Sequence, residues 1–354
     1  MQQKLAVAIA ALGLGMAMPL IAQEPGEKLQ ELETVLIVGE QPGPGLWKVS
    51  KGDHVMWVLA SYQPLPRDMV WRSHKVEARI AESQEVLYSG GVDIDAGIGL
   101  LKGITLIPAA IKATRIPDKK TLKDVLDAGT YSKWLALRRK YMGKDDDVEK
   151  LRPSIALGQL RSDAFRKSGL GGVSVHEVVG KARKKHKIRR VTTPAVKRTL
   201  KVQDPRGILK SAQKLDLPDL ECFKTGIERM ESDIQRVKTL ANAWSRGDIE
   251  TLRSLHRNLP LKEAVKEVCG YALMTALHEG STKDAAHAKK MMDDLLWHAE
   301  QASDQAQLDW IAAARKALDR NKTTFAVLSL PEVLSPDGHL AKLRELGYMV
   351  EEPM

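Results

Sequence analysis

The residue types that perform most enzyme chemistry are present in this chain, but not in the patterns that usually accompany it. The nine histidines include no pair four residues apart, which excludes an HExxH zinc site. The glycines form neither GxGxxG nor GxxxxGK[ST], so the sequence predicts no cradle for nucleotide phosphates. No GxSxG motif is present for a hydrolase nucleophile.

The segment Lys181–Arg190 is strongly basic, and Lys197, Arg198 and Lys201 follow it. One interpretation is a solvated helix end and loop, and the other is a stripe that binds an anionic envelope polymer or lipid head group. No aromatic residue is interleaved for base stacking, so nucleic acid is not an expected partner. The candidate anion-binding residues are Lys181, Arg183, Lys184, Lys185, Lys187, Arg189 and Arg190.

The two cysteines, Cys222 and Cys269, both lie in a region predicted to be helical. An even, isolated pair favours one disulfide if the protein folds in an oxidising compartment. The alternative is a pair of buried free thiols. Neither cysteine belongs to a CxxC motif, so zinc ligation is not expected.

The first 22 residues have the three parts of a secretory signal peptide. Lys4 precedes an apolar run from Leu5 to Ala17, and cleavage is expected after Ala22. The alternative is an uncleaved membrane anchor, although the apolar run is short beside the roughly 20 residues of a membrane span. Residues 23–44 are polar and rich in Gly and Pro, which indicates a flexible arm. We therefore expect an exported protein, periplasmic or secreted, with no transmembrane span in the mature chain.

Composition permits a sizeable folded core. Hydrophobic residues make up 43% of the 354 residues, charged residues make up 28%, and the net charge is +10. These values exclude collagen-like, mucin-like and wholly disordered proteins. Aromatic residues are only 5%, so Leu, Ala, Val, Ile and Met must fill most of the core.

Periodicity and turn residues predict strands near both ends of the chain and helices between them. The predicted strands are 34–38, 46–50, 54–59, 85–88, 324–330 and 348–351. The predicted helices are 73–82, two segments that begin at 121 and after Gly129 and end at Gly143, and 227–247, 261–280, 281–301, 304–320 and 339–346. We predict a mixed α/β fold in which N- and C-terminal strands form a central sheet covered by a largely helical middle region. Residues 45–354 would form one domain with a helical insert at about 119–320.

Several short motifs occur in a characteristic order along the chain. Residues 45–73 contain GLWKV, then LASYQPLP, then WRS. Near the other end, Phe325-Ala326-Val327 is followed by Asp337-Gly338 and by LxxLGYxV over 343–350. Between them lie YxxWxxL over 131–137 and LRP over 151–153. In order and spacing these motifs resemble the TraB/GumN family, which includes the TIKI metalloproteases, over roughly residues 45–352.

The resemblance implies a metal site from which this chain departs. The family carries two Gly-x-x-His motifs and an acidic residue at strand ends, where they can hold a divalent metal such as Mn or Zn that activates water. Here the first motif reads Ala60-Ser61-Tyr62-Gln63 and the second reads Ser329-Leu330-Pro331-Glu332, so both glycines and both histidines are replaced. The degenerate positions are Ala60, Ser61, Gln63, Ser329 and Glu332.

We therefore expect a catalytically degenerate member of that family, a pseudoenzyme with no metal or other cofactor. It would act as a binding or regulatory protein of the cell envelope, with an envelope protein, a peptide or an anionic polymer as partner. One alternative is a metal-dependent peptidase or hydrolase whose ligands are replaced by Glu332, Asp93 and a histidine such as His54 or His74. The other is a binder of anionic envelope polymers through residues 181–201.

Overall fold

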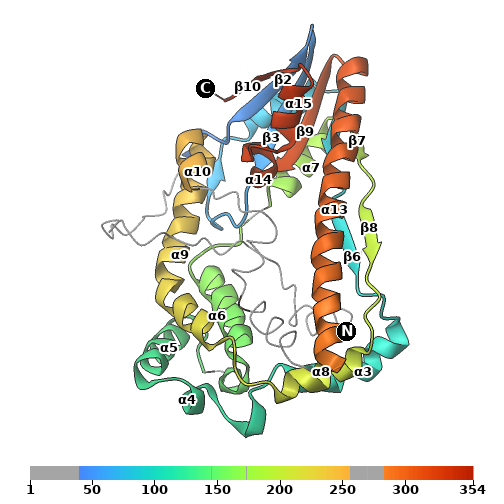
Figure 1. Cartoon of the computed structure of the whole chain (residues 1–354). Helices are drawn as coiled ribbons and strands as arrows, with labels where there is room; N and C mark the ends of the chain where they lie inside the picture. The colour runs from blue at the N-terminus through green and yellow to red at the C-terminus, as the bar shows by residue number, and fades with distance from the viewer. Residues whose placement is uncertain (1–39, 145, 173, 256–268, 270–282, 354) are drawn as a thin grey trace.

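A six-stranded mixed sheet forms one end of the protein (Figure 1). The computed structural model describes residues 40–144, 146–172, 174–255, 269 and 283–353. The strand order is β10 (Met349–Glu351), β2 (Leu46–Lys51), β3 (His54–Ser61), β9 (Thr323–Ser329), β5 (Glu85–Tyr88) and β7 (Arg189–Thr192). Strands from both ends of the chain therefore share one sheet, and the predicted α/β fold class is confirmed.

The centre of the sheet is a parallel pair of buried strands. β2 and β3 form an antiparallel hairpin, and β3 then pairs in parallel with β9 from Val55↔Thr323 to Ser61↔Ser329. β5 and β7 extend the parallel part. Residues Phe325 to Leu328 are all at most 2% exposed. Such continuous apolar runs are typical of parallel strands that are covered on both faces.

Two long helices connect the sheet to a helical part at the other end of the molecule (Figure 1). They are α9 (Leu220–Arg246) and α13 (Lys283–Arg320), and α13 packs on β2, β3, β5 and β9. The other helices are α2 (His74–Ala81), α3 (Leu100–Ala113), α4 (Leu122–Val125), α5 (Ala128–Tyr141), α6 (Pro153–Lys167), α7 (Val175–Lys185), α8 (Pro205–Lys214), α10 (Ile249–Leu255), α14 (Leu330–Leu334) and α15 (His339–Glu345). Two 3-10 turns span Pro117–Lys119 and Asp147–Lys150, and short strands pair as β1 (Glu40–Gln41) with β4 (Val70–Trp71) and β6 (Val92–Asp95) with β8 (Val196–Thr199).

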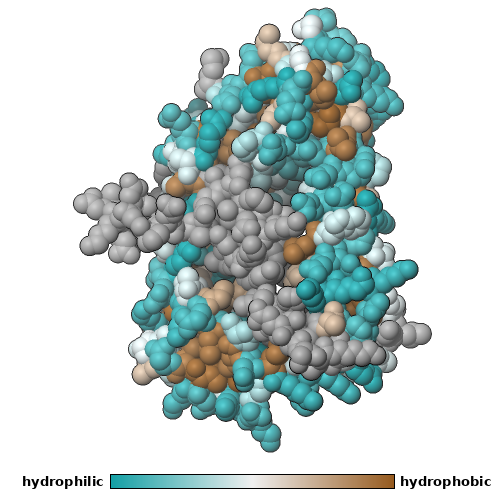
Figure 2. Space-filling model, in the orientation of Figure 1, coloured by the Kyte–Doolittle hydropathy of each residue, from teal (hydrophilic) through white to brown (hydrophobic). Residues whose placement is uncertain are grey.

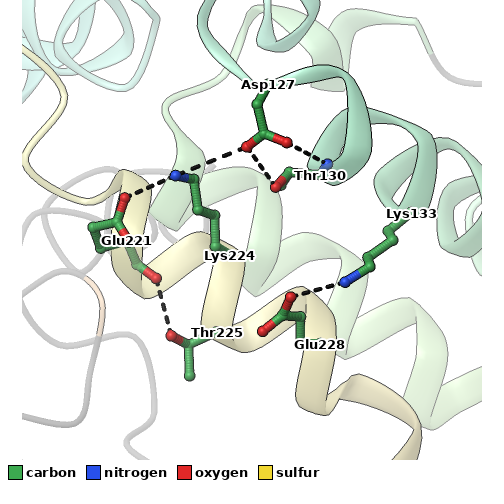
Figure 3. A network of polar contacts seen from close by, with 7 residues as sticks. All are labelled: Asp127, Thr130, Lys133, Glu221, Lys224, Thr225 and Glu228. Atoms are coloured by element: carbon green, nitrogen blue, oxygen red, sulfur yellow. Dashed lines mark hydrogen bonds and ion pairs between the residues drawn. The ribbon is translucent and has the colours of Figure 1, made fainter.

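α5, α6 and α9 enclose a second apolar core. Trp134, Leu160 and Phe223 are fully buried there. On the surface above it, Lys133 pairs with Glu228 at 2.8 Å, and a set of contacts around Asp127 and Lys224 joins the start of α5 to α9 (Figure 3). Exposed ion pairs contribute little stability, so the buried apolar contacts hold these helices together.

Arg152, in the LRP motif, fastens two helix ends. Its side chain is fully buried, and its guanidinium donates hydrogen bonds to the carbonyl oxygens of Ala113, Ala212 and Leu215. These carbonyls lie at the carboxyl ends of α3 and α8, where the last turn of a helix leaves acceptors without intrahelical partners. A cation is also favoured at this pole of a helix dipole.

The predicted disulfide between Cys222 and Cys269 is present, with the two Cα atoms 5.4 Å apart. Cys222 lies in the first turn of α9, and Cys269 is buried against the α5–α6–α9 core.

The structure differs from the predicted elements in several places. The helices predicted at 281–301 and 304–320 correspond, from residue 283 onward, to the single helix α13, because Ser303 and Asp304 are exposed while Ala302 and Ala306 continue the buried face. Within the segment interpreted as a solvated helix end and loop, Arg189–Thr192 pairs with β5, and β8 just beyond it pairs with β6. α3 was not predicted, and it contains both Gly103 and Pro108. The predicted signal peptide, most of the arm at 23–44, the strand at 34–38 and the helix at 261–280 lie outside the described residues, Cys269 excepted.

The surface is mostly hydrophilic on the face shown in Figure 2, with apolar side chains gathered near the sheet and near α5 and α6. Among the residues that the structure describes, no helix is long and apolar enough to cross a membrane.

The disulfide should make a large contribution to stability. Replacing both cysteines by serine should lower the free energy of unfolding by roughly 4 kcal/mol, because the bond closes a loop of 47 residues in the unfolded chain. Urea denaturation of the double variant beside the wild type measures this difference. Thiol titration of the unreduced, denatured wild type should find no free thiol, and two titratable thiols would contradict the prediction.

Candidate functional site

A cavity of about 360 Å³ opens at the carboxyl ends of β3 and β9. The parallel register aligns Ser61 with Ser329, so the segments that follow the two strands leave the sheet at the same edge. The apolar part of the wall consists of Tyr62, Pro64, Phe165, Val237, Leu240, Leu330 and Pro331, and the polar part of Ser61, Gln63, Arg161, His176, Asp233 and Ser329. In α/β sheets this edge is the usual place for ligands.

The first degenerate motif contributes hydroxyl and amide groups to this cavity. Ser61 donates a hydrogen bond to the carbonyl of Leu328 at 3.1 Å, which ties the ends of β3 and β9 together. Gln63 lines the cavity, and its Nε2 donates to Ser174 Oγ at 2.7 Å, just before α7. Gln63 therefore links the segment after β3 to the start of α7.

The second degenerate motif caps its own helix. Ser329 is the N-cap of α14, and its backbone N–H donates to Glu332 Oε2 at 2.6 Å. Ser329 Oγ accepts from the backbone N–H of Glu332, which completes a capping box. Leu330 and Pro331 line the cavity, whereas Glu332 is not part of its wall. The carboxylate predicted as a replacement ligand is thus engaged in holding the start of α14.

Ala60 occupies the glycine position of the first motif, and a residue of α9 holds its backbone carbonyl. Its carbonyl accepts a hydrogen bond from Trp244 Nε1 at 2.7 Å, and both residues are buried. Trp71 packs edge-on against Trp244, with ring centroids 5.5 Å apart. The Trp244–Ala60 hydrogen bond anchors the end of α9 to the end of β3.

A partly buried ion pair lines the cavity. Arg161 on α6 donates to Asp233 on α9 at 2.9 Å, and Asp233 is 8% exposed. Burial raises the pKa of Asp233, and the surrounding arginines oppose that shift. Tyr62 lies nearby, and burial raises the pKa of its hydroxyl, so it stays protonated at neutral pH. The two charged residues of the cavity wall, Arg161 and Asp233, therefore pair with each other.

A second cavity, of about 470 Å³, shares one residue with the first. His176, in the first turn of α7, lines both. The remaining wall of the second cavity consists of Tyr88, Glu177, Gly180, Lys181, Arg183, Lys184 and Arg190. Burial lowers the pKa of His176, and Arg190 lowers it further, so the imidazole is neutral at pH 7.

Some of the predicted anion-binding residues form ion pairs with carboxylates, and others do not. Lys181 pairs with Glu177 at 2.8 Å, Lys185 pairs with Glu77, and Arg189 pairs with Glu85. By contrast, within the described part of the chain no carboxylate pairs with Arg183, Lys184 or Arg190, and all three line the second cavity. Arg183 donates to the carbonyl of Ile188 at 2.9 Å, and the Arg190 guanidinium lies 5.0 Å from the centre of the Tyr88 ring.

The residues proposed for a rebuilt metal site are not brought together at the cavity. His54 begins β3, at the opposite end of that strand from Gln63, and its Nδ1 lies 2.5 Å from the carbonyl oxygen of Leu318. Asp93 belongs to β6, which pairs with β8 rather than with the main sheet. His74 is exposed at the start of α2. Among the described residues, no group of three His, Cys, Asp or Glu side chains is placed to hold a metal ion.

Neither His176 nor the Arg161–Asp233 pair is predicted from the sequence. For Asp233 a signal was present, because it falls on the apolar face formed by Met230, Ile234 and Val237. A charged residue in such a place needs a buried partner. For His176 no comparable signal exists, since its position depends on how α7 docks beside β5.

The fold and its cavities define an α/β protein with a ligand-sized cleft at the carboxyl ends of parallel strands. The chain belongs to the TraB/PrgY/gumN family, whose model matches residues 45–352. No curated protein and no solved structure is similar enough to be matched.

The Trp244–Ala60 hydrogen bond should stabilise the fold measurably. In Trp244→Phe the buried carbonyl of Ala60 loses its donor, and the free energy of unfolding should fall by about 1–3 kcal/mol. Trp297→Phe is the matched control, because Trp297 is 58% exposed. Urea unfolding followed by circular dichroism compares the two; equal stability of both variants would contradict the prediction.

His339 should make stability depend on pH. It is buried edge-on against Trp310, and its Nε2 lies 3.9 Å from Glu332 Oε1. Burial lowers its pKa below the ordinary 6.5, and the charge of Glu332 only partly opposes this. As pH falls through 6.5 the unfolded chain binds a proton before the folded one, so stability decreases.

In His339→Phe that proton-linked loss should be smaller between pH 6.5 and 5 than in the wild type. His176 retains its own lowered pKa, so some dependence remains. His74→Phe, at an exposed position, serves as the control and should follow the wild type. Thermal unfolding at a series of pH values measures this, and identical slopes for wild type and His339→Phe would refute it.

Proposed function

We propose that this protein is a catalytically degenerate member of its family that acts as a binding or regulatory protein of the cell envelope. It would reach the periplasm or the medium through a signal peptide at residues 1–22. The ligand would occupy the cavity at the ends of β3 and β9, and neither a metal nor another cofactor would be needed.

The observation that carries the proposal is the state of the two strand ends. The cavity is open and of ligand size, yet the two motif positions where the family has histidine hold Gln63, which lines the cavity, and Glu332, which does not. The amide of Gln63 and the carboxylate of Glu332 are engaged in hydrogen bonds that hold the cavity walls. An amide oxygen is also a weak ligand for a borderline metal. These features favour binding over metal-assisted hydrolysis.

The Cys222–Cys269 bond supports export, because disulfides persist in oxidising compartments. The basic cavity beside His176 supports the second candidate function, the binding of an anionic envelope polymer through residues 181–201. In that case the cations without carboxylate partners, Arg183, Lys184 and Arg190, would contact the polymer.

The proposal predicts that the mature protein does not cleave peptides by a metal mechanism. Wild type, Gln63→Ala and Glu332→Gln should show the same background rate with manganese, cobalt or zinc on peptide substrates. Glu332→Gln removes the charge of a carboxylate ligand while its amide oxygen can still accept the capping hydrogen bond from Ser329. It is therefore preferable to Glu332→Ala, which removes that hydrogen bond.

Metal-dependent cleavage by the wild type that both substitutions abolish would overturn the pseudoenzyme proposal in favour of a hydrolase with replaced ligands. Circular dichroism of each variant verifies that it is folded. A metal bound without cleavage does not count as activity, because a single carboxylate can hold a hard cation weakly.

A further inference from the structure

We propose that the two cavities form one composite site for an anionic amphiphile, with its charged head in the basic cavity and its apolar part in the cleft at the strand ends. This inference rests on the proposed binding function and specifies its ligand class. It starts from His176, which lines both cavities. A ligand that extends past His176 would reach from one cavity into the other.

The basic cavity has the charge and the donors for a head group. Four cations and one carboxylate line it, and the carboxylate, Glu177, already pairs with Lys181. Arg183, Lys184 and Arg190 therefore leave an excess of positive charge. Guanidinium groups suit the planar or tetrahedral oxygens of carboxylates and phosphates. The shared head-group chemistry is an oxyanion.

The cleft at the strand ends has the opposite character. Its side chains Phe165, Val237, Leu240, Leu330 and Pro331 offer apolar surface, and its charged residues Arg161 and Asp233 neutralise each other. Burial of a methylene group in such a place contributes about 0.8 kcal/mol. An apolar ligand part therefore gains from this cavity, whereas a second charged group does not.

Three features of the fold determine where His176 lies. It lies in the first turn of α7, its ring centre is 6.0 Å from that of Tyr88, and Ser174 two residues earlier is bonded to Gln63. Tyr88 ends β5 and Gln63 follows β3, so both cavities are built on the same edge of the sheet. The geometry thus holds the two chambers in a fixed relation to each other.

Isothermal titration calorimetry of the mature chain tests the proposal with octyl phosphate, butyl phosphate, inorganic phosphate and octyl glucoside, each below its micelle concentration. Octyl phosphate should bind at least about ten-fold more tightly than butyl phosphate, because four more methylenes are buried. It should also bind at least about ten-fold more tightly than octyl glucoside, which has the same tail and no charge. Inorganic phosphate should bind most weakly of the charged ligands.

Variants assign each part of the ligand to its cavity. The double variant Lys184→Ala, Arg190→Ala should weaken octyl phosphate about ten-fold or more and leave octyl glucoside unchanged. Phe165→Ala should weaken both octyl ligands and leave inorganic phosphate unchanged. Lys187→Ala is the matched control, because Lys187 belongs to the same basic run but lines neither cavity.

Equal affinity for octyl and butyl phosphate in the wild type would overturn the composite site, and this comparison needs no variant. Binding to phosphatidylglycerol vesicles but not to monomeric octyl phosphate, weakened as much by Lys187→Ala as by the double variant, would also overturn it and indicate a membrane surface instead. Metal-dependent peptide cleavage is a separate readout, so failure of the proposed function and failure of the composite site are distinguishable.

Discussion

The parallel pairing of β3 with β9 is the contact on which the rest of the structure depends. It joins residues 55–61 to residues 323–329, close to opposite ends of the chain, and everything between them must leave and re-enter the sheet. α9 and α13 accomplish this by running between the sheet and the distant helices (Figure 1). Because the strands are parallel and in register, the segments that follow Ser61 and Ser329 leave the sheet at one edge, and the cleft lies there.

The part of this fold that can be predicted from sequence is the part with strong local periodicity. The hairpin of β2 and β3, the apolar run of β9 and the amphipathic face of α9 all carry that signal. β7 does not, because it is a short edge strand of mostly exposed residues within a basic run and has no apolar alternation. Edge strands commonly carry such charges, which protect them from pairing with other chains. The sequence also predicts two helices in place of α13, since Ser303 and Asp304 are residues that commonly begin a helix.

The candidate site likewise has a part that the sequence predicts and a part that it does not. Positions 60–63 and 329–332 could be placed at strand ends from motif order, and residues 61–63 and 329–331 do line one cavity, whereas Ala60 and Glu332 do not. The capping of α14 by Glu332 is a local S-x-x-E pattern that the sequence contains. The contact of Gln63 with Ser174 could not be predicted from the sequence, because the two residues are far apart in the chain and meet only in the folded protein. His176 joins the site only through the docking of α7. Its role follows from its place in the lining of both cavities.

The contacts that shape the cleft are independent of metal-ligand chemistry. Trp244 holds the carbonyl of Ala60, Ser61 holds that of Leu328, and the Ser329 capping box fixes α14. The hydrogen bonds of Trp244 and Ser61 do not involve the side chain at position 63, whereas the capping box uses Glu332 itself. The cleft therefore depends in part on contacts behind its wall, and a change at Trp244 would disturb it without altering a residue that lines it.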